Sequence, residues 1–223
     1  MSTLFREIFE DWFHRPRYLV LLLGLLLLII LPPVSAILQA GNLILYISYG
    51  LVLILAALFT TTSYREGGLL LFLGIFSFVV FVVWGDRHPH WSWVNAIVTF
   101  IFFSYVFRKL LLYILNEKDV TVNTIYAVIC GYMILGVVFA PLLALLQNQF
   151  YSGSIQESIL DFYDLIYYSF ITLTTVGYGD IVPTNQIIKS VSIIIAITGQ
   201  IYLTFVVAII IGKYLASNSQ PSS

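Results

Sequence analysis

Long apolar runs separated by short polar stretches dominate the chain. A bilayer-crossing helix needs about 20 predominantly apolar residues, and six of the runs approach or exceed that length. These runs are apolar on every side, whereas a helix on the surface of a soluble domain keeps one polar face. The pattern predicts membrane helices at about 18–31, 42–62, 69–84, 91–115, 122–146 and 187–215.

The first run is short, and two prolines follow it directly. Pro32 and Pro33 mark either the outer end of the helix or a kink within a span that reaches Leu38. Residues 1–17 carry apolar side chains at helical spacing, and we expect them to lie along the inner membrane surface as an anchor or, alternatively, to bind a partner. No small-residue cleavage site follows the run, which argues against a cleavable signal peptide.

A short apolar segment that ends near Leu173 lies between the last two long runs. Its roughly 12 residues would span about 18 Å as a helix, which is too short to cross the hydrocarbon core. Ser158 or Asp161 can cap its start, and Asp161 and Asp164 suit the first turn. The segment is therefore predicted to enter the membrane and turn back, surrounded by protein or a watery cavity.

The stretch after this segment, Thr172–Asp180, reads TLTTVGYGD. A dehydrated cation needs a ring of oxygens, and an extended backbone can supply it if its carbonyls turn to one side. Gly177 and Gly179 can adopt φ values that most L-residues avoid, which permits this arrangement. A plain glycine turn is the alternative interpretation. Because the chain has a single such loop, a symmetric ring requires several chains.

The other residues of this stretch have complementary roles. We expect Val176 and Tyr178 to point away from the pore into packing, and the Thr175 hydroxyl to add oxygens at the inner mouth.

Composition agrees with a membrane protein. The chain is 60% hydrophobic and 9% charged, against about 25% charged in soluble domains, and its mean hydropathy is +0.98. A net charge of -1 implies no nucleic-acid partner. Cys130, the one cysteine, cannot form an intrachain disulfide and is expected to be a small buried hydrophobe.

The distribution of Lys and Arg predicts the orientation. With both termini cytoplasmic, only two basic residues fall outside, which agrees with the positive-inside rule for a multi-pass protein of the plasma (inner) membrane and places Asp180 outside. An outer aromatic belt would contain Trp84, Trp91 and Trp93, with Trp12 and Tyr18 near the inner surface. The inner basic residues are Arg6, Arg15, Arg17, Arg65, Arg108, Lys109, Lys118 and Lys213; the outer ones are Arg87 and Lys189.

Residues 166–214 resemble the pore module of potassium channels, whose selectivity filter carries the sequence TVGYG in four loops. Residues 167–183 resemble a pore helix, filter and outer mouth, and residues 199–208 resemble the inner helix of bacterial members. A weaker likeness extends back to Val120, whereas the first four helices resemble six-span channels in number alone.

The resemblance implies a homotetramer that conducts K+ in single file, with no cofactor besides the transported ion. Tyr167 and Tyr168 would form an aromatic cuff around Tyr178, where many relatives have tryptophan, so the hydrogen-bond donor that can reach Asp180 differs. Some relatives pair this aspartate with a pore-helix glutamate, but Ile171 stands at that place. The ion-facing oxygens would come from Thr175, Val176, Gly177, Tyr178 and Gly179, with K+ at the first four, and Thr174 would sit behind the filter.

The predicted fold is an all-α membrane protein with six transmembrane helices, a re-entrant pore helix and a filter loop. We expect an interfacial lead at 1–17, a four-helix membrane domain at 18–116, a pore domain at 117–216 and a cytoplasmic tail at 217–223. The few residues after the last helix are too few for a ligand-binding domain.

Three polar or flexible positions lie near the predicted pore. Gly199 is either a gating hinge or a small residue that allows close helix packing. Gln200 and Thr204, one turn apart, either face the cavity or bond a neighbouring helix.

Arg108 and Lys109 lie late in an otherwise apolar helix, where snorkelling to the inner surface explains them. Weak or absent voltage dependence is therefore predicted.

Other functions have weaker signals. Asp86, His88 and His90 could bind a metal or sense pH, but a solvated loop explains them better. The stretches 163–164 (YD) and 177–180 (GYGD) resemble the signatures of intramembrane aspartyl proteases. The aspartates of such proteases lie on two spanning helices, whereas Asp164 and Asp180 flank one short helix, so no enzyme is predicted. A poorly selective cation channel and a non-conducting scaffold or transporter subunit remain alternatives.

Overall fold

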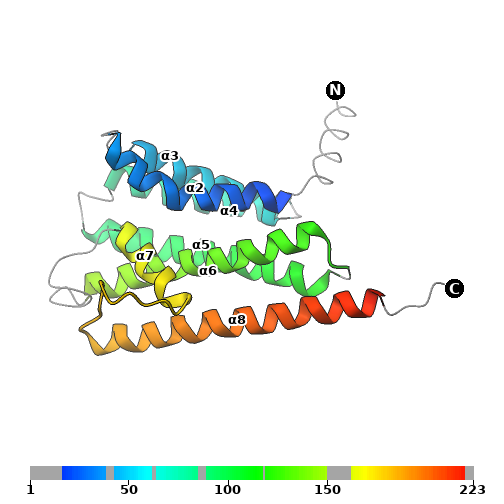
Figure 1. Ribbon diagram of the computed structural model, residues 1–223. Coiled ribbons are helices and arrows are strands. Elements are labelled where there is room, and N and C mark those ends of the chain that lie inside the picture. Colours follow the sequence, from blue (N-terminus) through cyan, green and yellow to red (C-terminus); the bar gives the residue numbers. More distant parts are fainter. Residues whose placement is uncertain are drawn as a thin grey trace, which may run out of the picture.

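The computed structural model describes residues 17–38, 43–61, 64–84, 89–117, 119–149 and 162–218, which form seven helices (Figure 1). All of these helices except the short α7 are long and apolar enough to cross a membrane. The prediction of an all-helical membrane protein with one short helix is thus confirmed. The helices are α2 Arg17–Ile37, α3 Leu43–Thr60, α4 Tyr64–Trp84, α5 Pro89–Asn116, α6 Val122–Gln149, α7 Phe162–Leu173 and α8 Gln186–Asn218.

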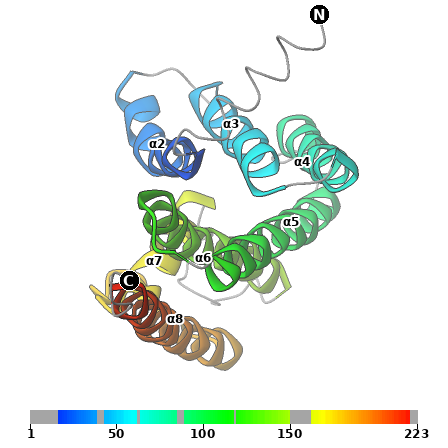
Figure 2. The ribbon, with the colours of Figure 1, turned by 90° about the vertical axis from the view of Figure 1, so that its right-hand side faces the viewer.

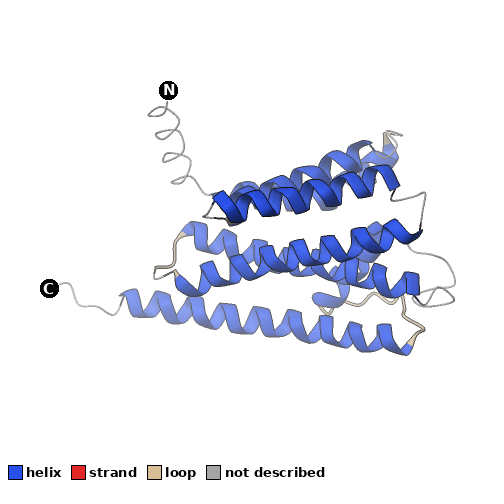
Figure 3. Ribbon diagram, turned by 180° about the vertical axis from the view of Figure 1, so that it is seen from behind, coloured by secondary structure: helices blue, strands red, loops and turns tan. Residues whose placement is uncertain are grey.

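The helices are arranged in successive layers. Seen end-on, α2, α3 and α4 lie on one side, α5 and α6 in the middle, and α8 on the other side (Figure 2). Helix α6 contacts α2, α5, α7 and α8, and is therefore the centre of the assembly. The short α7 packs against both α6 and α8, and the loop after it leads to the start of α8 (Figure 3).

Helix α2 continues through its two prolines to Ile37, so they do not mark its end. Pro33 has no N–H to donate to the carbonyl of Ile29, four residues earlier. The Tyr163 hydroxyl of α7 donates a hydrogen bond to that carbonyl across 3.4 Å. A neighbouring helix thus satisfies a backbone group that proline freed, which is how membrane helices tolerate proline.

Helix α4 begins at Tyr64, five residues before the predicted start at about residue 69, which corrects the prediction. Glu66 lies in the first turn, where a carboxylate is favoured by the helix dipole. It also forms an ion pair with Lys109 of α5, which holds this turn against the bundle. The other differences are shifts of helix ends by up to three residues.

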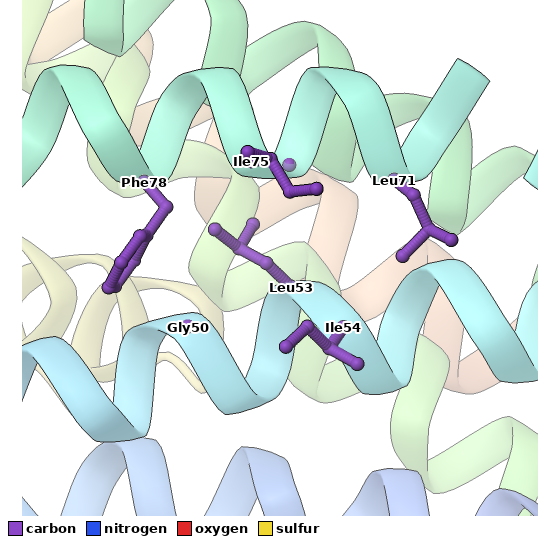
Figure 4. Close-up of a pocket in the computed structure, with 7 residues that line it drawn as sticks. Gly50, Leu53, Ile54, Leu71, Ile75 and Phe78 are labelled. Carbon is purple, nitrogen blue, oxygen red and sulfur yellow. The ribbon is translucent and has the colours of Figure 1, made fainter. Parts of the chain in front are cut away.

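Helices α3 and α4 pack closely where glycine leaves room (Figure 4). A Cβ at Gly50 would lie 2.9 Å from the ring of Phe78, so this contact requires glycine. A cavity of about 110 Å³ remains beside it. Its lining is entirely apolar or glycine, as expected for a space between membrane helices: Gly50, Leu53, Ile54, Leu71, Gly74, Ile75 and Phe78.

A buried group of hydroxyls joins α3, α4 and α5. The hydroxyl oxygen of Tyr49 lies 2.8 Å from that of Ser77 and 2.9 Å from that of Thr99. The hydroxyls of Ser77 and Thr99 also pair with each other at 2.8 Å, and Ser77 donates to the Asn95 amide oxygen. Lipid is as apolar as the helices, so the hydrophobic effect does not drive helices together within a membrane. Hydrogen bonds such as these therefore contribute, together with van der Waals packing, to the association of α3, α4 and α5.

Several cationic groups gather at one end of the bundle. The Arg17 guanidinium lies over the ring of Tyr113, near the end of α5. The Lys213 ammonium donates to the carbonyls of Ile114, Leu115 and Glu117 and thereby caps the end of α5. Helix α8 begins at the opposite end of the bundle, which is also the end at which α7 starts (Figure 1).

Candidate functional site

Helix α6 has a glycine, Gly136, that lets α7 pack closely against it. A Cβ at Gly136 would lie 2.5 Å from the ring of Phe170, so glycine allows the two helices to approach. The Ser169 hydroxyl also donates to the Gly136 carbonyl across 2.7 Å, and Ser169 is fully buried. Gly136 and Ser169 are not part of the sequence prediction, since a lone glycine or serine within an apolar run gives no distinctive signal.

The end of α7 is closed by donors from the following loop and from α6. A helix leaves its last four carbonyls without partners in the helix. Here the carbonyl of residue 170 accepts from Thr174, that of residue 171 from Gly177, and that of residue 172 from Thr175. The Leu173 carbonyl accepts from the Tyr132 hydroxyl across 3.3 Å. The loop is therefore attached to the negative end of the α7 dipole, which favours a nearby cation.

These hydrogen bonds determine the direction of loop carbonyls. The Gly177 N–H points back to the Ile171 carbonyl, at 3.1 Å. The peptide bonds in the described residues are all trans, and in a trans peptide the C=O points opposite to the N–H. The carbonyl of Val176 therefore points away from α7. The sequence prediction concerns several carbonyls that turn to one side, and this hydrogen bond determines the direction of one of them.

Positive φ angles alternate along the loop. Gly177 has φ 52° and Gly179 has φ 79°, as their residue type allowed. Thr175 also has φ 60°, and it is the one non-glycine residue with positive φ in the described part of the chain. The left-handed region costs an L-residue roughly 1–2 kcal/mol. Nothing about threonine predicts this conformation, which is imposed by the hydrogen bonds on both sides.

Asp180 lies beside α7 because the loop folds back along the helix. The Tyr167 hydroxyl donates to its carboxylate across 2.6 Å. This hydrogen bond lowers the pKa of Asp180 and raises the pKa of Tyr167 to about 12. Tyr167 is thus the donor that reaches Asp180 in place of the tryptophan expected from the family resemblance.

The remaining aromatic residues of the predicted cuff lie apart within one chain. The Tyr168 hydroxyl pairs with the Ser192 hydroxyl of α8 at 2.6 Å, and its side chain is buried. Tyr178 is 74% exposed and Val176 is 53% exposed. In a single chain, the two side chains predicted to point into packing therefore lie on the surface.

Helix α8 approaches the base of the loop at Gly199. A Cβ there would lie 2.1 Å from the Leu173 carbonyl oxygen, so this contact excludes any larger residue. The next residue, Gln200, donates its side-chain amide to the Thr175 hydroxyl across 3.4 Å. Thr204, one turn further on, has an exposed side chain. Gly199 was predicted to be either a gating hinge or a small residue that allows close packing, and this contact with Leu173 favours close packing.

Some predicted features lie outside the described residues. These are the lead before Arg17, the Asp86 and His88 side chains, Ser158 and Asp161, and the tail after Asn218; the side chains of Trp84, His90 and Trp91 are also not described. Among the described residues, no three His, Cys, Asp or Glu side chains gather as a metal site would require.

Comparison with known proteins concerns the second half of the chain. Residues 127–216, which begin within α6 and end two residues before the end of α8, match a family described as ion channel. This segment, less than half of the chain, is what resembles the ion-channel family. It includes both aspartates of the protease-like pattern, Asp164 and Asp180.

Two curated relatives are similar over shorter segments. The chain is 36% identical over 55 residues to "Two-pore potassium channel 4" of Arabidopsis thaliana, a match of 25% of this chain and 19% of that protein. It is 35% identical over 69 residues to "Voltage-gated potassium channel" of Aeropyrum pernix, which is 30% of this chain and 23% of that protein. The chain thus spans about a fifth of the length of the relatives it matches. No solved structure matches significantly.

Proposed function

We propose that this protein is a potassium-selective channel that conducts K+ passively through a homotetrameric pore. The observation that carries the proposal is the loop at residues 174–180, whose positive φ angles alternate and whose N–H groups bond back to α7. A backbone held in this way directs carbonyl oxygens away from its support, where they can replace the hydration shell of a cation.

The ion-facing oxygens are assigned to Thr175, Val176, Gly177 and Tyr178, with Gly179 at the outer end. The two curated relatives are named potassium channels, which supports K+ as the conducted ion. A tyrosine at position 178, rather than an acidic residue, also favours K+ over a poorly selective cation pore. The carboxylate of Asp180, held by Tyr167, adds negative charge at the outer mouth.

A tetramer supplies what one chain lacks. One loop presents oxygens to one side of an ion, so a closed ring needs further copies around an axis. Partner copies would also cover Val176 and Tyr178, and the apolar exposed face of α8 offers a surface for them. That face includes Ile193, Ile194, Ile197, Ile201 and Phe205.

The orientation follows from the charged end of the bundle. Arg17, Lys109 and Lys213 gather at one end, and the positive-inside rule makes that end cytoplasmic. Both termini are then inside, and Asp180 faces outward in a plasma (inner) membrane.

The test is ion flux from liposomes that contain the purified full chain, with K+ compared against Na+. Gly177→Ala should abolish K+ flux, because it puts a side chain on a residue with positive φ. Gly212→Ala is the matched control, since a Cβ there meets open space and its φ is not in the positive range. Chemical cross-linking of the same sample reports whether four chains assemble.

The outcomes separate the alternatives. K+ flux that far exceeds Na+ flux, and that is lost in Gly177→Ala alone, supports the proposal. Equal fluxes of the two ions indicate a poorly selective cation channel. No flux from a correctly assembled tetramer indicates a non-conducting membrane scaffold or a transporter subunit.

A further inference from the structure

The described part of α8 touches the filter loop through one polar side chain. The Gln200 amide nitrogen lies 3.4 Å from the Thr175 hydroxyl oxygen, a long hydrogen bond between two exposed groups. Thr175 is also the non-glycine residue with φ 60°. An unusual backbone conformation and an inter-element contact therefore coincide at the inner end of the filter.

The backbone around this contact is held closely from two sides. At Gly199 the α8 backbone lies against the Leu173 carbonyl, so near that no Cβ fits. The Tyr132 hydroxyl of α6 donates to the same carbonyl. Because Gln200 directly follows Gly199, the same contact fixes the position of the Gln200 backbone beside the loop.

The chemistry of the Thr175 hydroxyl gives this contact a function. A hydroxyl has one proton and two lone pairs, and only a lone pair can bind a cation. An amide N–H that occupies one lone pair keeps the hydroxyl from rotating and orients its oxygen. Without that donor, the hydroxyl can turn and present its proton to the ion or to a nearby carbonyl.

We propose that Gln200 is a positioning residue that orients the Thr175 hydroxyl so that its oxygen faces the innermost cation. This inference rests on the proposed channel function and adds a residue outside the filter to its inner ion site. In the tetramer, each chain would orient its own threonine, so the site depends on a ring of amides just inside the filter.

Other hydroxyls on α8 do not share this arrangement. Thr198 donates to the Ile194 carbonyl of its own helix. Thr204 lies one turn beyond Gln200, on the same side of the helix, and is exposed. Thr204→Val therefore removes a polar group near the pore without removing the proposed donor, and serves as the matched control.

The experiment measures block by Ba2+, which is close to K+ in radius but doubly charged, applied at the cytoplasmic side in planar bilayers. Gln200→Met keeps the shape of the side chain but removes the donor. Loss of a hydrogen bond worth about 1 kcal/mol should weaken Ba2+ block about fivefold. Gln200→Leu should act in the same direction and replaces this variant if it fails to assemble.

A double-mutant cycle with Thr175 distinguishes positioning from a structural role. Thr175→Ser keeps the hydroxyl, so Gln200→Met should still weaken block about fivefold in that background. Thr175→Cys replaces the hydroxyl with a weak acceptor, and Gln200→Met should then have no further effect. Thr204→Val should leave block unchanged.

The contrary results are equally clear. Unchanged block in both Gln200 variants, or equal weakening in the Ser and Cys backgrounds, would overturn the role of Gln200 while leaving the channel proposal intact. Wild-type protein that assembles but passes no K+ would overturn both proposals together.

Discussion

At the scale of single residues, the exposed hydrogen bond between Tyr167 and Asp180 can be tested by changing the pH. Tyr167 is the donor, and Asp180 accepts through a carboxylate that must be ionised to act only as an acceptor. Because the hydrogen bond favours the ionised form, the pKa of Asp180 lies below its ordinary value of 3.8. The hydrogen bond between Tyr167 and the Asp180 carboxylate is therefore fully present at pH values above 3.8, and it is lost as the pH falls through the lowered pKa of Asp180.

Tyr167→Phe should move the acid inhibition of K+ flux to a higher pH. Without the donor, the pKa of Asp180 returns toward 3.8, so the outer mouth loses its charge at less acidic pH. The measurement is the initial K+ flux at external pH values between about 3 and 7. Tyr163→Phe, one turn earlier on α7, is the control, and an identical acid midpoint in both variants would refute the role of Tyr167.

Thr175 shows that a residue type can be compatible with a role without indicating its conformation. Its hydroxyl was predicted to face the inner mouth, and in the structure it accepts from Gln200. Its positive φ could not be anticipated, because an isolated threonine disfavours that region.

At the scale of the elements, the contact between α7 and α8 depends on Gly199. The hinge and packing roles make different predictions. If Gly199 serves close packing, any larger residue at this position pushes α8 away from the Leu173 carbonyl. If Gly199 is a hinge, a larger residue reduces the flexibility of α8 but causes no strain in this conformation.

Gly199→Ala should lower the free energy of unfolding of the purified protein by about 1–3 kcal/mol, which is the usual cost of overpacking. It should also reduce K+ flux. Gly212→Ala makes the same chemical change in open space and should leave both unchanged or slightly raise stability. Thermal unfolding followed by fluorescence provides the comparison. Normal stability with lost flux would favour the hinge instead.

The prolines of α2 illustrate the same dependence on neighbours. From the sequence, Pro32 and Pro33 allowed either a helix end or a kink within a longer span. Helix α2 continues past both prolines, and Tyr163, more than a hundred positions away in the chain, donates to the Ile29 carbonyl that Pro33 leaves without its usual donor.

At the scale of the whole molecule, α5 is the last of the first four described helices, and it packs against α6 without a row of gating charges. Residues 89–107 of this helix contain no Lys or Arg. Lys109 is paired with Glu66, and the ammonium of Lys213 caps the end of α5. Steep voltage gating needs about 3–4 charges per subunit that move across the membrane.

The conductance of reconstituted protein should therefore vary weakly with voltage. Planar-bilayer currents in symmetric K+ between about −100 and +100 mV measure this directly, at about 2.3 kcal/mol per charge per 100 mV. A steep curve that flattens in Arg108→Gln would contradict the prediction and would identify Arg108 as a gating charge.

The sequence alone determined the membrane class, the number of candidate spans, the short helix that cannot cross, and the loop with its two positive-φ glycines. These follow from local properties: apolar length, helix rise per residue and the conformational freedom of glycine. They do not depend on which segments meet in space.

Only the tertiary structure decided which groups close the end of α7, that Tyr167 rather than Tyr168 reaches Asp180, and that Gln200 reaches Thr175. These contacts join residues of different elements, either two helices or a helix and the loop, and their geometry depends on packing at Gly136 and Gly199. An apolar run gives no sign of which face meets a neighbour, because lipid and protein interior are equally apolar surroundings.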